Sequence, residues 1–235
     1  MSQTTLNLVA ITIFSLVMVS LLGPLLHISP VVPAVAAFSI LSIATLDSFS
    51  LQGRLGTLVV DTIAQFSPEH RSRIVRHEAG HFLAAHLLGI PVTGYTLNAW
   101  EALRQGQPGQ GGVSFGTAEL EAQIATGQIS TQMVDRYCTV WMSGIAAEQL
   151  EYGNAEGGAN DRETIRLLWM MQLKRSLGEA DLKQRWALLQ AKTLLQDHKE
   201  AYAALVEAME QRQPVEVCQE TIQASLKSAN LAGQS

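Results

Sequence analysis

The first 46 residues contain no Asp, Glu, Lys or Arg, and this absence of charge is the clearest feature of the composition. The chain as a whole is 16% charged, a low value, and the shortfall lies in this N-terminal part. The absence of charged residues over this length argues strongly against a pair of buried helices in a soluble fold. Met1 to Asn7 also lacks a basic residue, which argues against a cleaved signal peptide.

Three further features that are rare or absent in the sequence exclude classes of function: cysteine clusters, an excess of positive charge and a P-loop motif. The two cysteines, Cys138 and Cys218, form no metal-type cluster, and each lies in an apolar helical pattern typical of a buried free thiol in a reducing compartment. The net charge of −5 gives no basis for a nucleic-acid partner. No Gly-x-x-x-x-Gly-Lys-Ser/Thr motif occurs in the 235 residues, so they contain no P-loop ATPase.

Two apolar runs fill the N-terminal part. Residues 6–28 are about as long as a membrane span, which needs roughly 20 residues, and residues 31–46 form a shorter run after a turn at His27 to Pro30. We expect residues 1–50 to form a transmembrane hairpin of two spans. A single span followed by a buried or interfacial segment remains open. The arginines that follow predict an integral membrane protein whose soluble part lies on the cytoplasmic side or in an equivalent compartment such as a stroma (Arg54, Arg71, Arg73, Arg76).

The central motif is His-Glu-x-x-His at His77, Glu78 and His81. On a helix the two histidines share one face and suit two corners of a tetrahedral zinc site. Glu78 lies about 100° around the helix from His77, where it can reach a water on the metal and act as a general base. Pro68 and Glu69 after Ser67 predict the start of this helix, and Gly89 predicts its end.

The remaining segments predict a mainly helical fold with one small sheet. A linker helix is expected over 51–66. Strands are expected over 92–100 and 113–115, separated by a loop over 101–112, and the free edge of such a strand could bind an extended peptide. Helices are expected over 117–127, over 130–152 and from Asn160, and then to the end of the chain in two or three pieces. The polar tail is placed at 229–235.

The order of these motifs resembles the peptidase domain of the FtsH family, the membrane-anchored ATP-dependent zinc proteases. The resemblance rests on His77 to His81, on Gly112 to Phe115, on Gly144 to Glu148 and on Gly157 to Asp161. It covers roughly residues 65–225. It implies a peptidase domain over 67–228, with the small sheet beside the helix that carries the motif.

This resemblance also implies the roles of the site residues. His77, His81 and Asp161 would bind zinc with a water as the fourth ligand, and Glu78 would accept the proton of that water as it attacks a peptide carbonyl. Glu148 would orient one histidine, or else pair with a nearby arginine. An oligomer of identical chains is a further implication.

The chain departs from the family in having no ATPase module. The leading prediction is a membrane-anchored zinc metalloendopeptidase that cleaves loosely folded or membrane proteins, alone or with an ATPase-bearing partner. The alternative is a non-catalytic FtsH-like membrane subunit or scaffold that works with such a partner. An intramembrane protease, which would bury the motif helix, is disfavoured because the charged residues at the start of this helix place it outside the bilayer (Glu69, His70, Arg71, Arg73, Arg76).

Overall fold

A computed structural model describes residues 3–50, 56, 62, 67–106 and 111–232. It divides the chain into two units, one made of residues 1–68 and 98–111 and the other of residues 69–97 and 112–235. Both are mainly helical, as predicted. The linker helix predicted over 51–66 lies largely outside the described residues.

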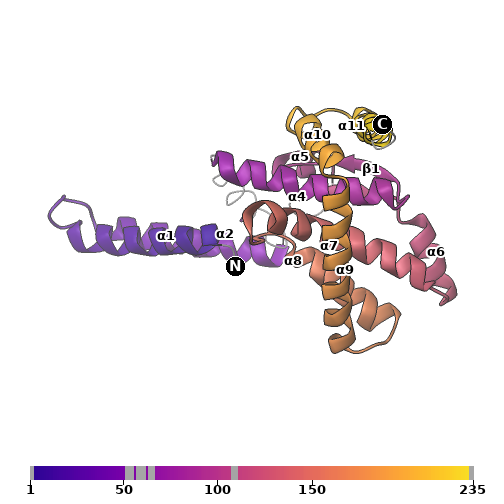
Figure 1. Cartoon of the computed structure of the whole chain (residues 1–235). Helices are drawn as coiled ribbons and strands as arrows, with labels where there is room; N and C mark the ends of the chain where they lie inside the picture. Colours follow the sequence, from indigo (N-terminus) through magenta and orange to yellow (C-terminus); the bar gives the residue numbers. More distant parts are fainter. Residues whose placement is uncertain (1–2, 51–55, 57–61, 63–66, 107–110, 233–235) are drawn as a thin grey trace. The chain divides into compact units, whose positions relative to one another are not determined.

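The first unit contains the apolar helices α1 (Gln3–Leu22) and α2 (Val31–Ser50), which lie side by side (Figure 1). Both expose large apolar side chains along their length. Among the described residues, Val31–Phe49 is long and apolar enough to cross a membrane by length and composition, and Leu6–Leu22 is a shorter apolar stretch. The two predicted runs are therefore helices, although residues 23–28 of the first run belong to the turn.

The same unit contains a short helix, α5 (Ala99–Arg104), where the end of a strand and the start of a loop were predicted. The Asn98 side chain accepts a hydrogen bond from the backbone N–H of Glu101, and its amide donates to the Glu101 carboxylate at 2.8 Å. This reciprocal cap stabilises the first turn of α5. The prediction of a loop over 101–112 was therefore wrong in its first half, because the capping function of Asn98 was not recognised.

The second unit contains the motif helix α4 (Pro68–Leu87) and a two-stranded antiparallel sheet, β1 (Val92–Tyr95) and β2 (Val113–Phe115). The predicted strand over 92–100 is thus shorter than expected. The sheet lies beside α4, since Phe82 packs edge-on against Tyr95 and His81 against Phe115. This confirms the predicted hairpin beside the motif helix.

Helices make up the rest of the second unit. In chain order they are α6 (Ala118–Thr126), α7 (Thr131–Tyr152), α8 (Ala159–Leu167), the π-helix η1 (Leu168–Gln172), α9 (Leu177–Asp197), α10 (Lys199–Glu210) and α11 (Val215–Ala232). Two of them begin or end where predicted: Gly127 ends α6 in the left-handed conformation, and Ser130 caps α7. η1 was not predicted, and α11 reaches into the segment predicted as the polar tail.

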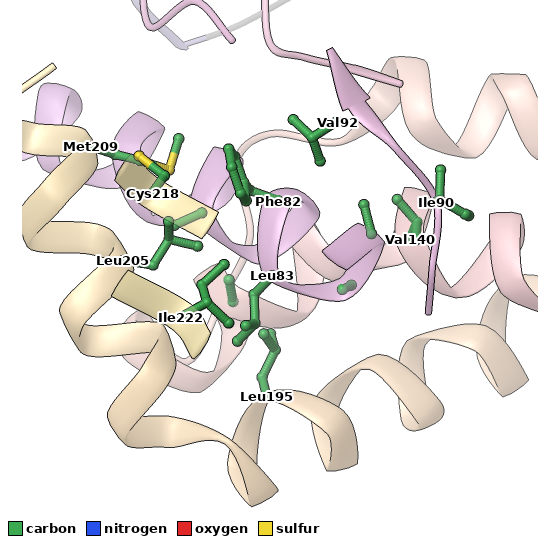
Figure 2. Close-up of a cluster of buried hydrophobic side chains, with 14 of the residues drawn as sticks. Phe82, Leu83, Ile90, Val92, Val140, Leu195, Leu205, Met209, Cys218 and Ile222 are labelled. Carbon is green, nitrogen blue, oxygen red and sulfur yellow. The ribbon is translucent and has the colours of Figure 1, made fainter. Parts of the chain in front are cut away.

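The core of the second unit is built around α4. Figure 2 shows Phe82 and Leu83 of α4 gathered with Leu205, Met209 and Ile222 of α10 and α11. All five side chains are fully buried, and burying each contributes roughly 1.5–3 kcal/mol. α4 also packs on α7, where Gly80 allows close approach to the Ser143 backbone. The motif histidines are thereby held between two helices of one packed unit.

Candidate metal centre

The two motif histidines lie on the buried side of α4. His77 and His81 are four residues apart, and their side chains are almost completely inaccessible to solvent. Asp161, in the first turn of α8, is half-buried and faces them. The structure thus brings together the three residues that the sequence analysis named as ligands, and as a group they could hold a metal ion.

Three donor atoms converge at this point. The Nε2 atoms of His77 and His81 are 3.1 Å apart, and Oδ2 of Asp161 lies 3.5 Å from the first and 3.6 Å from the second. In a tetrahedral zinc site with bonds of about 2.0–2.1 Å, neighbouring ligand atoms are about 3.3 Å apart. The observed triangle therefore has the size that a tetrahedral metal ion requires.

The hydrogen bonds of the two Nδ1 atoms determine which nitrogen of each imidazole carries the proton and which one carries the lone pair. Nδ1 of His81 lies 2.7 Å from the carbonyl oxygen of Val140, which can only accept, so this nitrogen must carry the proton. Nδ1 of His77 lies 2.7 Å from Oε1 of Glu148 and donates to it in the same way. Both Nε2 atoms of the neutral imidazoles then present lone pairs to each other and to Asp161. This arrangement is repulsive unless a cation lies between the donors.

The electrostatics of the group indicate the same preference for positive charge. Burial lowers the pKa of His77, but hydrogen bonds with Asp161 and Glu148 raise it to about 10. Burial also lowers the pKa of His81, and the charge of Asp161 outweighs this and raises it. Burial raises the pKa of Asp161, whereas the two histidines hold it well below its usual range. Without a metal, the histidine pair retains a proton at neutral pH.

Glu148 of α7 connects both sides of the centre. Its Oε1 accepts from His77 and from the backbone N–H of Gly157, and its Oε2 accepts from Arg73 at 3.0 Å and from the N–H of Glu156 at 2.9 Å. Burial raises the pKa of Glu148, but the His77, Glu156 and Arg73 hydrogen bonds lower it to about 2. One carboxylate therefore fixes the His77 ring and also the turn that leads into α8 and Asp161.

Two glycines allow the donor atoms to converge. A Cβ atom at Gly144 would lie 2.4 Å from Nε2 of His77 and 2.5 Å from Nε2 of His81, at the point where the donors converge. Gly158 has a φ of +84° and precedes α8, and a Cβ atom there would lie 2.1 Å from the Ile145 side chain. Both positions need glycine for the three candidate ligands to meet.

Glu78 lies next to His77 on α4, and its carboxylate points toward the sheet. Its Oε2 accepts a hydrogen bond from the backbone N–H of Val113 in β2 at 2.9 Å. This contact leaves Oε1 without a partner from β2. The geometry is compatible with a general base whose orientation is fixed by the strand.

Three groups of the site were not predicted from the sequence: the Arg73 side chain, the Val140 carbonyl and the Val113 N–H. Arg73 precedes His77 by one helical turn, so its place on the same face of α4 was readable from the spacing. The two backbone groups carry no signal in the sequence, because any residue type supplies them. Their positions follow from the packing of α4 against α7 and β2.

No protein-family model matches the chain, and no curated protein matches it either. The resemblance to the FtsH family accordingly stays a prediction.

Proposed function

We propose that the chain is a membrane-anchored zinc metalloendopeptidase, in which His77, His81 and Asp161 bind the metal. The observation that carries the proposal is the convergence of three lone-pair donors within a triangle of tetrahedral size, with Glu78 on the same helix. A purely structural zinc site has four protein ligands and no need of a base. Among the described residues, three ligands are grouped here.

Zinc, when bound, acts as a Lewis acid and lowers the pKa of a ligated water toward neutrality. The residues of the chain supply the rest of the chemistry. Glu78 accepts the proton from the attacking water and later returns it to the leaving amine. The Val113 N–H keeps the Glu78 carboxylate oriented, and Glu148 keeps the His77 ring oriented.

An extended polypeptide is the substrate class that fits the surroundings of Glu78. β1 is the one strand that pairs with β2 among the described residues, and the Val113 N–H points away from β1 toward Glu78. A peptide that adds to this edge of β2 through backbone hydrogen bonds would be placed beside the base. Such pairing selects for an unfolded segment and not for one particular side chain.

The membrane attachment is part of the proposal. α2, with α1 beside it, would anchor the chain, and the arginines that follow would place the peptidase on the cytoplasmic or stromal side. The absence of an ATPase motif limits the stand-alone enzyme to polypeptides that are already loosely folded, unless an ATPase-bearing partner unfolds them.

The decisive experiment measures the zinc content and the proteolytic activity of the detergent-solubilised full chain on a loosely folded model protein. We expect cleavage that a chelator abolishes and zinc restores. Glu78→Gln should retain zinc and lose at least about 100-fold in rate. Glu163→Gln, an exposed glutamate of α8, is the control for the substitution itself and should cleave like the wild type.

Two results would count against the enzyme. Cleavage by Glu78→Gln at the wild-type rate would remove the proposed base. A wild-type chain that carries zinc and cleaves nothing would favour the alternative function, a non-catalytic subunit that works with an ATPase-bearing partner.

A further inference from the structure

A second group of charged side chains lies away from the metal ligands, on the side of α8 that faces α9. Here the surface is hollowed to about 300 Å³, and the walls include Arg162 and Arg166 of α8 and Asp181, Gln184 and Arg185 of α9. Met142 and Leu188 supply apolar lining. The volume is at the lower end of the range for small-molecule sites, roughly 300–1,000 Å³.

The charges in this hollow are not balanced. Arg166 pairs with Asp181 at 3.2 Å. The side chains of Arg162 and Arg185 have neither a hydrogen bond nor an ion pair with any other described residue, although Arg162 is partly buried. Three arginines against one aspartate leave two positive charges in the hollow, whereas the whole chain carries a net charge of −5.

The chemistry of these groups selects a class of ligand. A guanidinium group presents a planar fork of N–H donors that matches the oxygens of a phosphate or carboxylate. A phosphate monoester carries about −1.5 to −2 charges at neutral pH, which matches the two unbalanced positive charges better than a single carboxylate does. The apolar side chains of Met142 and Leu188 would contact a short organic group attached to the phosphate.

We propose that the hollow between α8 and α9 is a binding site for a phosphate group, held by Arg162, Arg166 and Arg185. Gln184 holds the backbone of Arg162 in place, since its amide donates to the backbone oxygen of Arg162 at 3.0 Å. Arg162 directly follows Asp161 on α8, so a bound phosphate would be anchored one residue from a proposed metal ligand. The phosphate belongs either to a free metabolite or to a phospholipid headgroup.

The test measures the thermal unfolding midpoint of the full chain in detergent with inorganic phosphate, at constant ionic strength. About 10 mM phosphate should raise the midpoint of the wild type by about 2–4 °C. Arg162→Gln/Arg185→Gln should abolish the shift. Arg104→Gln/Arg175→Gln removes the same two charges from exposed arginines outside the hollow and should keep the shift.

Calorimetric titration with glycerol 3-phosphate and with dihexanoyl phosphatidic acid separates the two sources. If the lipid binds at least about tenfold more tightly than glycerol 3-phosphate, the site recognises a phospholipid headgroup. If the two bind equally, the site recognises a free phosphate compound. Either result supports the phosphate site. A shift that survives in Arg162→Gln/Arg185→Gln would place the phosphate elsewhere, for example on a metal at His77 and His81, and would overturn the proposal. The absence of any shift in the wild type would also overturn it. None of these results depends on proteolytic activity.

Discussion

Arg73 shows how much of the candidate metal centre depends on a residue that cannot itself bind a metal. Its guanidinium donates to Glu148 and to Asn154 and stacks over the ring of Tyr152. Glu148 is almost completely buried, and a buried carboxylate needs a compensating charge to stay ionised. Through Glu148, Arg73 therefore controls the orientation of His77.

We predict that Arg73→Met weakens zinc binding by about 10–100-fold, because Glu148 loses its buried counter-charge and no longer orients His77. Competition with a chromophoric chelator measures the affinity, and the absorption spectrum of the cobalt-substituted protein reports the ligand geometry. Arg76→Met is the matched control. Arg76 lies about one turn further along α4, is partly buried and pairs with Glu151 at 3.4 Å. Equal affinities for the two variants would contradict the role of Arg73.

The histidine pair predicts a pH dependence that differs between the metal-free and the metal-bound chain. The pKa of His77 is raised from 6.5 to about 10 without a metal, so its proton stabilises the fold fully below pH 6.5. This stabilisation is lost as the pH rises through about 10. We expect the unfolding midpoint of the chelator-treated chain to fall between these values, and that of the zinc-saturated chain to fall less. A metal-free chain whose midpoint is constant over this range would refute the prediction.

At the scale of elements, the centre exists because α4 and α7 approach each other closely at their glycines. A Cβ atom at Gly80 would lie 2.5 Å from the Ser143 carbonyl oxygen and 2.9 Å from the Ala147 side chain. These atoms belong to the interior of α7 and cannot move aside cheaply. The two helices therefore tolerate no side chain at this contact.

We predict that Gly80→Ala destabilises the chain by about 1–3 kcal/mol, since the overpacking outweighs the gain in helix propensity. Gly178→Ala should have the opposite sign and stabilise by up to about 1 kcal/mol, because the same substitution in α9 meets no atom within 4 Å. Chemical denaturation of both variants measures the difference. Stabilisation by Gly80→Ala would show that α4 and α7 are not held this closely.

At the scale of the whole molecule, the 235 residues contain no P-loop motif, so we expect the proposed peptidase not to use ATP to unfold its substrates. We predict that the solubilised chain degrades a permanently unfolded variant of a small model domain and leaves the stably folded parent intact. ATP should change neither rate. Time courses with the matched pair of substrates measure both rates. Degradation of the folded parent without ATP would show that the chain can itself unfold proteins.

The sequence determined the elements whose signals are local. The apolar runs, the start of α4 at Pro68, the Ser130 cap of α7 and the glycine stop of α6 all depend on residues adjacent in the chain, and their helices formed close to the predicted ranges. The spacing of His77 and His81 also fixed a shared helical face, because four residues make about one turn. α5 was missed although its signal is local, and η1 breaks the α-helical hydrogen-bond pattern on which the prediction relied.

Only the tertiary structure decided which distant residues meet. Asp161 is 80 positions beyond His81, and its approach depends on the turn at Gly158, on the Glu148 hydrogen bonds and on the missing side chain of Gly144. The partners of both Nδ1 atoms, the contact of Glu78 with β2 and the arginine-lined hollow arise in the same way. The physical reason is that the sequence of a helix determines which side chains share a face. The packing of the neighbouring helix or strand then determines whether those side chains contact a ligand, an opposite charge or solvent.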